Sequence, residues 1–398
     1  MNQDFYKKKL KNGVTVLFEK RKLPIITSSA SVKWGAEFES EKIKGISHLM
    51  EHLMFKGTKT RSSEEIAREI EKKGGIINAF TDEEVTAYWN KLPSRFWKTG
   101  VDIASDLILN PKFDAEEFEK EKKVVIEEIK MYNDTPRMYV LDKIKSMLYK
   151  KPFGMSIAGD EKVVASLKLD DVKNLFDKYY TTDDMVLCCV GDGNFDDICE
   201  FAEKTFPVKK RSLIEKKPIK INMERIETRK GVDQANFVFG FHAPKLCDKE
   251  KYLYEIVGGY LWDGMSSRMF QEIREKRGLC YAVKGFLDLG SNFGYGGIYV
   301  GTLAEKIKQV KELILKEFKN LKNINKKDFD EVKEQLIGGN ELGKENSDGV
   351  MIDLMREEFA GRAEEHYEYE ERIKKVKFDD VRNFVLKNYS SFALIPEK

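Results

Sequence analysis

Two histidines with a glutamate beside the second form the feature of this chain with the clearest chemical meaning. His48 and His52 are half of the four histidines in 398 residues, and Glu51 precedes the second directly. On a helix, positions i and i+4 share one face about one turn apart, so both imidazoles can bind a single metal ion. Glu51 can then reach a water molecule held by that ion. The spacing therefore predicts a metal-assisted hydrolytic site.

A third metal ligand must come from another part of the chain, because a catalytic zinc ion usually has three protein ligands and one open position. The acidic segment 114–133 is typical of a helix and carries two adjacent glutamates. Glu127 has lysines at i−4 and i+3, which places it on a solvated face. Glu128 has apolar residues at its flanking positions, so we expect it to point toward the core, where a carboxylate needs a partner. Glu121, two turns earlier, is expected to orient a ligand, although from the residues alone it and Glu128 could be ordinary surface carboxylates.

The composition restricts the class of protein. A length of 398 residues predicts two domains of roughly 200 residues each. The net charge of +2 gives no indication of a nucleic-acid partner. No apolar run reaches the length of a membrane span, and the first residues do not resemble a signal peptide, so we expect a cytoplasmic protein with no membrane partner. The five cysteines lack metal-type spacing and are expected to be reduced.

An internal repeat indicates that the chain is a duplication. Residues 169–175 match residues 378–384, and a second match and a third, weaker one occur in the same order with nearly constant spacing. The second half has no histidine pair at the corresponding place, and Gly339 falls opposite Glu128. One half thus carries the metal site and the other does not. The predicted organisation is a catalytic domain at 1–206, a linker at 207–220 and a homologous domain without metal at 221–398.

The expected fold class is α+β, with two homologous α/β-sandwich domains, each a mostly antiparallel sheet packed with helices. Strands and helices are grouped along the chain and do not alternate strictly, which disfavours a parallel doubly wound sheet. The expected strands are 14–18, 26–32, 78–92, 236–241 and 294–300, and the expected helices are 64–73, 115–132, 306–321 and 326–337.

These residues resemble the pitrilysin (insulinase) family of inverzincin zinc peptidases, whose motif has the order His-x-x-Glu-His. The resemblance includes residues 45–58, and Glu128 follows the second histidine at the family's spacing for its third ligand. In the second half, residues 274–281 match the family's arginine and tyrosine. The resemblance covers essentially the whole chain and is closest to the short members, similar to a mitochondrial processing peptidase subunit.

The resemblance implies a function and a role for each residue. It implies an endopeptidase with one Zn²⁺ per chain that cleaves peptides or unfolded segments inside a clamshell chamber. It also implies a homodimer, because a two-domain chain needs a second copy to complete that chamber, with Arg274 and Tyr281 serving the zinc site of the other subunit. The implied site comprises His48, His52 and Glu128 as zinc ligands, Glu51 as general base on the zinc-activated water, Glu121 as a supporting group, and Asn78, Ala79, Phe80, Arg274 and Tyr281 as substrate-binding residues.

Two other functions are compatible with parts of the sequence. A non-catalytic peptide-binding or scaffold subunit of the same family is disfavoured because the histidines and glutamates that such subunits commonly lose are all present. An unrelated metal-dependent hydrolase is disfavoured by the match at Arg274 and Tyr281. His242 and His366 lack metal-type neighbours and are expected to be structural.

Overall fold

The computed structural model describes residues 4–210 and 217–397. The predicted linker at 207–220 includes residues 211–216, which lie outside the described residues. The chain divides into two compact units, and each unit combines segments that are distant in sequence. Unit 1 comprises Met1–Ile129, Ser156–Lys216 and Gly343–Tyr367, and unit 2 comprises Lys130–Met155, Lys217–Leu342 and Glu368–Lys398.

The sheet of unit 1 has the strand order β1-β2-β6-β3-β5-β4. Only the β2/β6 pair of this sheet is parallel. Strand β6 is buried along its whole length, which explains its nearly continuous apolar sequence. The range 78–92, expected as one strand, is a hairpin that turns where Asp82 Oδ1 accepts from the N–H groups of Glu84 and Val85. The strands are β1 (Phe5–Lys9), β2 (Thr15–Lys20), β3 (Ile25–Val32), β4 (Ile76–Thr81), β5 (Thr86–Pro93) and β6 (Met185–Gly191).

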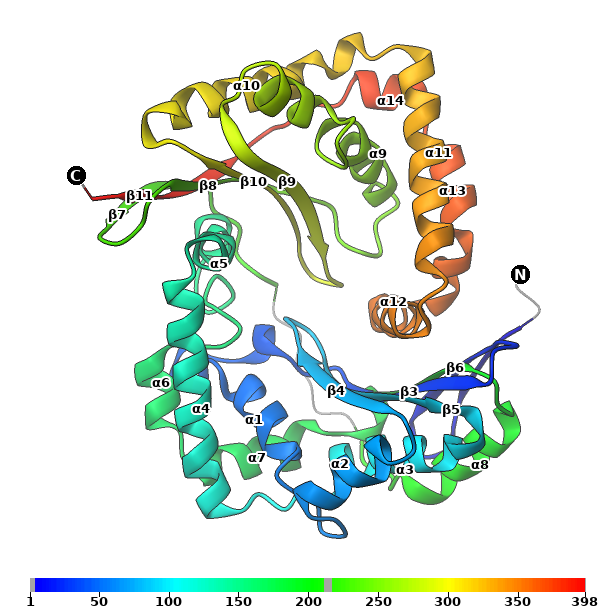
Figure 1. The fold of residues 1–398 in the computed structure, drawn as a ribbon. Helices are drawn as coiled ribbons and strands as arrows, with labels where there is room; N and C mark the ends of the chain where they lie inside the picture. The colour runs from blue at the N-terminus through cyan, green and yellow to red at the C-terminus, as the bar shows by residue number, and fades with distance from the viewer. Residues whose placement is uncertain (1–3, 211–216, 398) are drawn as a thin grey trace. The chain divides into compact units, whose positions relative to one another are not determined.

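Helices cover both faces of this sheet (Figure 1). Helix α3 packs against β3 and β5, and α12, which comes from the second half of the chain, packs against β6 and β3. The helices of unit 1 are α1 (Ile46–Met54), α2 (Ser63–Glu71), α3 (Trp97–Leu109), α4 (Ala115–Asp134, up to Ile129), α6 (Glu161–Ser166), α7 (Leu169–Tyr179), α8 (Phe195–Thr205) and α12 (Ser347–Ala360).

The sheet of unit 2 repeats the topology of the first. Its order β7-β11-β8-β10-β9 matches β2-β6-β3-β5-β4, and its one parallel pair, β7/β11, corresponds to β2/β6. This agreement supports the duplication inferred from the repeat. Its elements are α5 (Pro136–Leu148), β7 (Glu224–Arg229), β8 (Ala235–His242), α9 (Lys251–Leu261), β9 (Cys280–Leu289), β10 (Gly294–Thr302), α10 (Ile307–Asn320), α11 (Lys326–Gly343, up to Leu342), α13 (Tyr369–Lys375), α14 (Phe378–Arg382) and β11 (Ser390–Pro396).

The two halves of the sequence exchange a helix. Val350, Met351 and Leu354 of α12 share a buried cluster with Leu17 and Val186 of the first sheet. The equivalent helix of the first half, α5, packs against β8 and β11 of the second sheet. Each sheet therefore buries one face under a helix from the opposite half of the chain.

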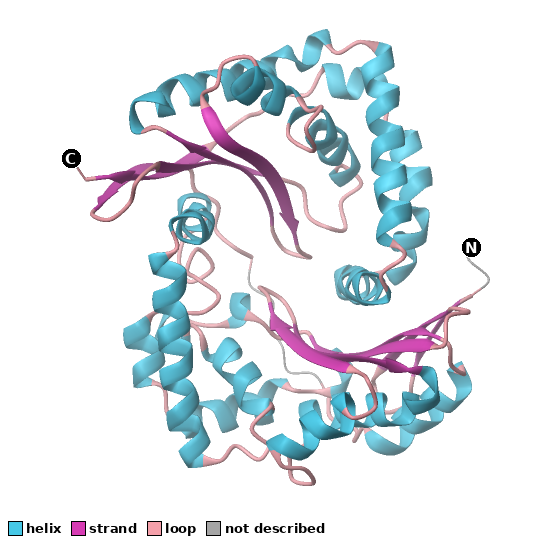
Figure 2. Ribbon diagram, in the orientation of Figure 1, coloured by secondary structure: helices cyan, strands magenta, loops and turns pink. Residues whose placement is uncertain are grey.

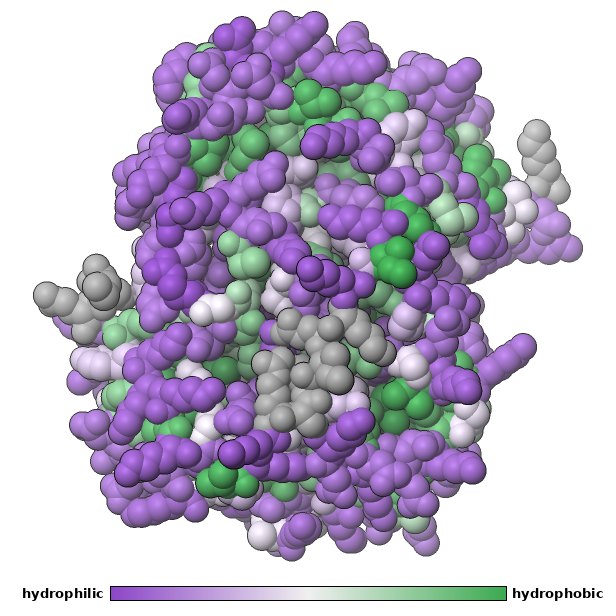
Figure 3. Space-filling view, turned by 180° about the vertical axis from the view of Figure 1, so that it is seen from behind, coloured by the Kyte–Doolittle hydropathy of each residue, from purple (hydrophilic) through white to green (hydrophobic). Residues whose placement is uncertain are grey.

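The secondary structure confirms the predicted α+β class. Figure 2 shows helices and strands grouped into separate layers, and each sheet is antiparallel except for one pair. The face shown in Figure 3 is mostly hydrophilic, in agreement with a charged-residue content of 35%. None of the described helices combines the length and apolar character needed to cross a bilayer.

Candidate metal centre

Helix α1 carries both histidines and the glutamate between them. It begins after Gly45, the N-cap, which has a left-handed conformation with φ of 97°. Leu49 and Leu53 are buried and fix one face of the helix in the core. His48 and His52 are half-buried on the neighbouring face, with ring centroids 4.8 Å apart. The i, i+4 spacing thus places the two imidazoles as the sequence predicts.

Helix α4 supplies the third candidate ligand. Glu128 lies on its half-buried side, whereas Glu127 is exposed. The apolar residues that flank Glu128 are only partly on the core side: Val125 is buried, whereas Val124 and Met131 are exposed. The carboxylate of Glu128 faces the histidines because of where α4 lies and not because its flanking residues form a continuous apolar face.

The ligand atoms of these three residues converge. Candidate donor atoms of His48, His52 and Glu128 all lie within 4.8 Å of one another. The Glu128 carboxylate is 3.7 Å from Nε2 of His48 and 3.5 Å from Nε2 of His52. Neighbouring ligands of a tetrahedral zinc ion, bound at about 2.1 Å, are about 3.4 Å apart. Two imidazoles and a carboxylate at these separations fit a zinc ion with one open position.

His52 has an orienting partner behind it. Its Nδ1 lies 3.2 Å from Oε2 of Glu121, and the other oxygen of Glu121 forms an ion pair with Lys56 at 2.8 Å. A carboxylate on the second ring nitrogen fixes the tautomer that leaves Nε2 free for a metal. Nδ1 of His48, in contrast, is buried with no hydrogen-bond partner among the described residues. Lys56 was not predicted, although it lies four residues after His52.

The protonation of His48 suits metal binding. Burial, together with the nearby His52, lowers the pKa of His48 to about 4, while Glu128 opposes the change. At neutral pH the imidazole of His48 is therefore uncharged and presents a lone pair, as a metal ligand must.

Glu51 lies beside the converging ligands and has an unusual environment for a carboxylate. Its Oε2 accepts a hydrogen bond of 2.6 Å from the hydroxyl of Thr81. Burial raises the pKa of Glu51, and Thr81 and His52 partly oppose this rise. A raised pKa brings a carboxylate closer to the range in which it can exchange protons near neutral pH. Thr81 was not among the predicted site residues, although it is the last residue of the strand that contains them.

The predicted peptide-binding residues Asn78, Ala79 and Phe80 lie on β4, an edge strand. Strand β4 pairs with β5 on one side, and no strand in the described part of the chain pairs with its other side. Asn78 is exposed, and its side chain accepts a hydrogen bond from the N–H of Ala79. An open edge of this kind can pair with an extended peptide through main-chain hydrogen bonds.

Arg274 and Tyr281 lie in unit 2, Arg274 in the π-helical turn Phe270–Glu275 and Tyr281 near the start of the edge strand β9. The guanidinium of Arg274 lies 4.8 Å from the ring centroid of Phe270, and Tyr281 is 51% exposed. The hydroxyl of Tyr281 is 3.2 Å from that of Tyr299, which donates to Oδ1 of Asn236. Both predicted residues thus present polar groups at the surface of unit 2.

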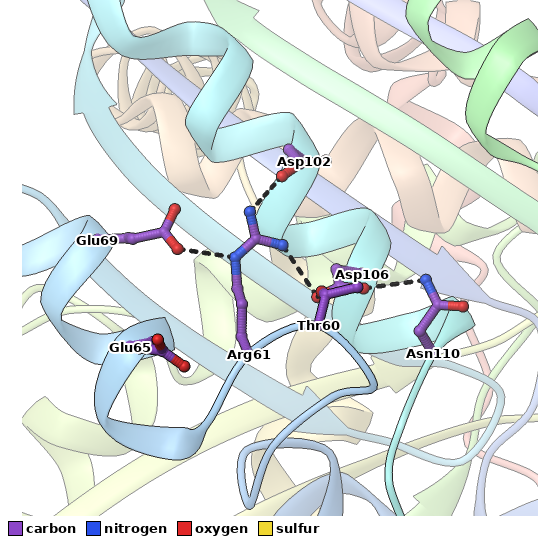
Figure 4. Close-up of a pocket in the computed structure, with 7 residues that line it drawn as sticks. All are labelled: Thr60, Arg61, Glu65, Glu69, Asp102, Asp106 and Asn110. Carbon is purple, nitrogen blue, oxygen red and sulfur yellow. Dashed lines mark hydrogen bonds and ion pairs between the residues drawn. The ribbon is translucent and has the colours of Figure 1, made fainter.

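A second charged cluster fixes the segment that follows α1 (Figure 4). Arg61 bonds to Glu69 of α2 and to Asp102 and Asp106 of α3. The hydroxyls of Thr58 and Thr60 also donate to Asp106. Because Arg61 pairs with these carboxylates, the cluster holds the segment that follows α1 against α2 and α3.

Two family models match the chain. The model described as insulinase (peptidase family M16) matches residues 15–161, and the model described as peptidase M16 inactive domain matches residues 166–336. The chain belongs to the insulinase family of peptidases. In this insulinase-family chain, the "inactive domain" match begins in the first half, at residue 166, and contains a single histidine, His242.

Similar proteins in other organisms carry zinc protease names. An uncharacterized zinc protease of Bacillus subtilis (strain 168) is 34% identical over 85% of this chain and 84% of its own length. An uncharacterized zinc protease of Rickettsia felis is 32% identical, covering 99% of this chain and 97% of its own. These relatives support the predicted short two-domain type of the insulinase family.

Solved structures of the family share the fold. A protease from Helicobacter pylori superposes with a TM-score of 0.90 at 21% identity, covering 98% of this chain and 99% of that chain. A peptidase M16 inactive domain structure from Pseudomonas fluorescens gives a TM-score of 0.88 at 17% identity, covering 99% and 98%.

Proposed function

We propose that this chain is a zinc-dependent endopeptidase that cleaves peptides or unfolded segments. The observation that carries this proposal is the convergence of His48, His52 and Glu128, with Glu51 on the same helix as the histidines. The donor set is that of a catalytic zinc site, with three protein ligands and one open position. The names of the relatives support the same metal and the same class of enzyme.

The residues divide the chemistry among them. Bound zinc supplies a Lewis acid that polarises the peptide carbonyl and lowers the pKa of a water molecule. Glu51 accepts the proton of the attacking water and returns it to the amine that leaves when the C–N bond breaks. Thr81 holds one oxygen of Glu51, which keeps the carboxylate in place during both transfers. Glu121 keeps His52 in the tautomer that can bind the metal.

The edge strand β4 indicates how substrate is held. A peptide that pairs with β4 must be extended, since main-chain hydrogen bonds to a strand edge need an extended partner. Thr81, at the end of this strand, donates a hydrogen bond to Glu51, so a peptide paired with β4 would lie close to the proposed base. Folded proteins rarely expose such segments, and we therefore propose peptides and unfolded chains as the substrates.

The test is cleavage of a set of quenched peptides, with and without a chelator. We expect cleavage that is lost with the chelator, restored by zinc and abolished by Glu51→Gln. Glu128→Gln should also abolish it, whereas Glu127→Gln, one residue away on the exposed face of α4, should retain it. Full activity in metal-free protein, or a fully active Glu51→Gln variant, would overturn the proposal.

We also propose that the chain works as a homodimer in which Arg274 and Tyr281 of one subunit serve the zinc site of the other. An arginine and a tyrosine suit a peptide carbonyl or an oxyanion, because both donate hydrogen bonds to oxygen. Mixing inactive Glu51→Gln with inactive Tyr281→Phe should restore part of the activity. A mixture that forms dimers and stays inactive would contradict completion in trans. The chamber and the cytoplasmic location stay predictions.

A further inference from the structure

The N-terminus of the metal-binding helix α1 cannot be capped in the usual way. The first N–H groups of a helix lack partners in the helix and are usually satisfied by a Ser, Thr, Asp or Asn side chain at the N-cap. The N-cap here is Gly45, whose φ of 97° disfavours other residues. A Cβ on Gly45 would also lie 2.6 Å from the carbonyl oxygen of Ala158. The cap must therefore come from another residue.

Glu39 supplies this cap from six residues upstream. Its Oε2 accepts from the N–H of Gly45 at 2.9 Å, and its Oε1 accepts from the N–H of Ser47 at 2.7 Å. The carboxylate is fully buried, so water cannot replace it. A negative charge at this end of the helix also interacts favourably with the helix dipole. The residue after Ser47 is the metal ligand His48.

A buried lysine keeps this carboxylate in place. Lys44 is fully buried, and its Nζ lies 3.7 Å from Glu39 and donates to the carbonyl oxygen of Ala36 at 2.6 Å. Burial raises the pKa of Glu39, while Lys44 and the two N–H donors oppose this rise. A charge pair buried this deeply is seldom the most stable filling of a core, which favours a role in holding a specific geometry.

The segment that carries Glu39 is itself fixed. Trp34 stacks on Tyr179 with centroids 4.0 Å apart, and its carbonyl accepts from Thr86. The N–H groups of Ala36 and Glu37 donate to the turn between β4 and β5. These contacts fix the backbone that carries Glu39, and Glu39 in turn bonds to the first N–H groups of α1.

We infer that Glu39 is a positioning residue of the metal centre: its buried carboxylate, held by Lys44, sets the start and the rotation of α1 and thereby the placement of His48, Glu51 and His52. Glu39 does not touch the metal or the substrate. The inference rests on the proposed function only in that these three side chains form the metal centre.

The experiment measures zinc affinity in the full chain, by competition with a chromophoric chelator and without any peptide. The variants are Glu39→Gln and the double variant Glu39→Gln/Lys44→Met, in which no buried charge is left unpaired. The amide that Glu39→Gln introduces has one accepting oxygen and so cannot place an acceptor on each of the two N–H groups, which removes half of the cap. The control is Glu317→Gln, which removes a buried carboxylate paired with Arg268 in unit 2.

We expect both Glu39 variants to bind zinc roughly tenfold or more weakly than the wild type at a temperature where all proteins are folded. Glu317→Gln should keep the wild-type affinity even if its melting temperature falls equally. A double variant that unfolds cooperatively and binds zinc as tightly as the wild type would overturn the inference. These affinities decide the matter whether or not the protein cleaves peptides, so a failure of the proposed peptidase activity is recorded separately.

Discussion

At the scale of single residues, the proposed metal centre includes a carboxylate that is not one of the proposed metal ligands. Glu121 is nearly buried between His52 and Lys56, so its two oxygens have separate partners. Replacing Glu121 with Gln removes the charge that favours a proton on Nδ1 of His52. We predict a zinc affinity lower by roughly 10- to 100-fold, measured by chelator competition.

The control for this change lies on the same helix. Glu119 is exposed and pairs with Lys122, and Glu119→Gln should leave zinc affinity unchanged. If Glu121→Gln binds zinc as the wild type does, the carboxylate does not orient His52.

His366 allows a prediction of pH dependence away from the metal centre. It is buried in unit 1, where burial, together with Lys344 and Arg21, lowers its pKa to about 4 against the opposing effect of Glu19. Nδ1 of His366 lies 3.7 Å from Asp353. Because the unfolded chain takes up a proton near pH 6.5 and the folded chain does not, this group stabilises the fold above pH 6.5. That contribution is lost as the pH falls toward about 4.

The measurement is the free energy of unfolding in denaturant at about pH 7.5 and about pH 5, with a chelator present. We expect the wild type to lose about 2 kcal/mol more than His366→Gln between these two values. His48 and Asp82 also titrate abnormally, but both proteins contain them, so their effects cancel in the comparison. Equal losses in the two proteins would show that His366 is not held neutral by the fold.

Single residues also show what the sequence could and could not predict about the site. The positions of His48 and His52 follow from helical periodicity alone, and the structure places both on one helix. Thr81 could not be found in this way, because its contact with Glu51 joins a strand to a helix 30 residues away. Glu39 carries no motif either, since its role depends on the left-handed conformation of Gly45.

At the scale of elements, strand β10 determines where Tyr281 lies. A Cβ on Gly301 would be 2.1 Å from Cζ of Tyr281, so the ring lies directly over this glycine. We predict that Gly301→Ala displaces the ring and breaks its contact with Tyr299, with a loss of stability of about 1–3 kcal/mol from overpacking. If Tyr281 binds substrate, kcat/KM should also fall about tenfold or more while zinc affinity stays the same.

Gly297 provides the comparison on the same strand and the same face. Its Cβ would crowd Phe286 at 2.5 Å and not Tyr281. Gly297→Ala should therefore reduce stability without a specific loss of kcat/KM. Similar losses of kcat/KM in both variants would assign the effect to the strand and not to Tyr281.

Helices and strands that are set by hydrophobic periodicity were predicted well. A turn that depends on side-chain hydrogen bonds was not predicted. Helix 115–132 corresponds to α4, and the expected strands 14–18 and 26–32 correspond to β2 and β3. The range 78–92 was expected as a single strand because its turn contains no glycine or proline, and side-chain bonds of Asp82 form the turn instead.

At the scale of the whole molecule, the duplication and the packing divide the chain differently. The repeat predicts contiguous halves at 1–206 and 221–398, and the two sheets share one topology. The compact units nevertheless interleave, because α5 belongs to unit 2 and α12 to unit 1. The repeat could not reveal this exchange, because it relates α5 to α12 without indicating which sheet each helix covers.

The exchange predicts that the first half cannot fold alone. A fragment of residues 1–206 lacks α12, which leaves Leu17, Val186 and Val190 of the first sheet uncovered. It also leaves Val140 and Ile144 of α5 without the second sheet. Burial of a large aliphatic side chain contributes about 1.5–3 kcal/mol to stability. Loss of the burial of several such side chains is comparable with the whole free energy of unfolding of an ordinary domain.

We therefore expect fragment 1–206 to lack cooperative unfolding and specific zinc binding, as measured by near-ultraviolet circular dichroism during denaturation and by chelator competition. Co-expression with residues 207–398 should restore both, because each fragment supplies the helix that the other sheet needs. The Leu354→Asp variant of the second fragment is the control, since it places a charge in the cluster that α12 forms with the first sheet, and it should complement poorly. A fragment 1–206 that unfolds cooperatively and binds zinc as the full chain does would contradict this prediction. It would show that the first half folds without α12, so that the packing of α12 on the first sheet is not required for folding.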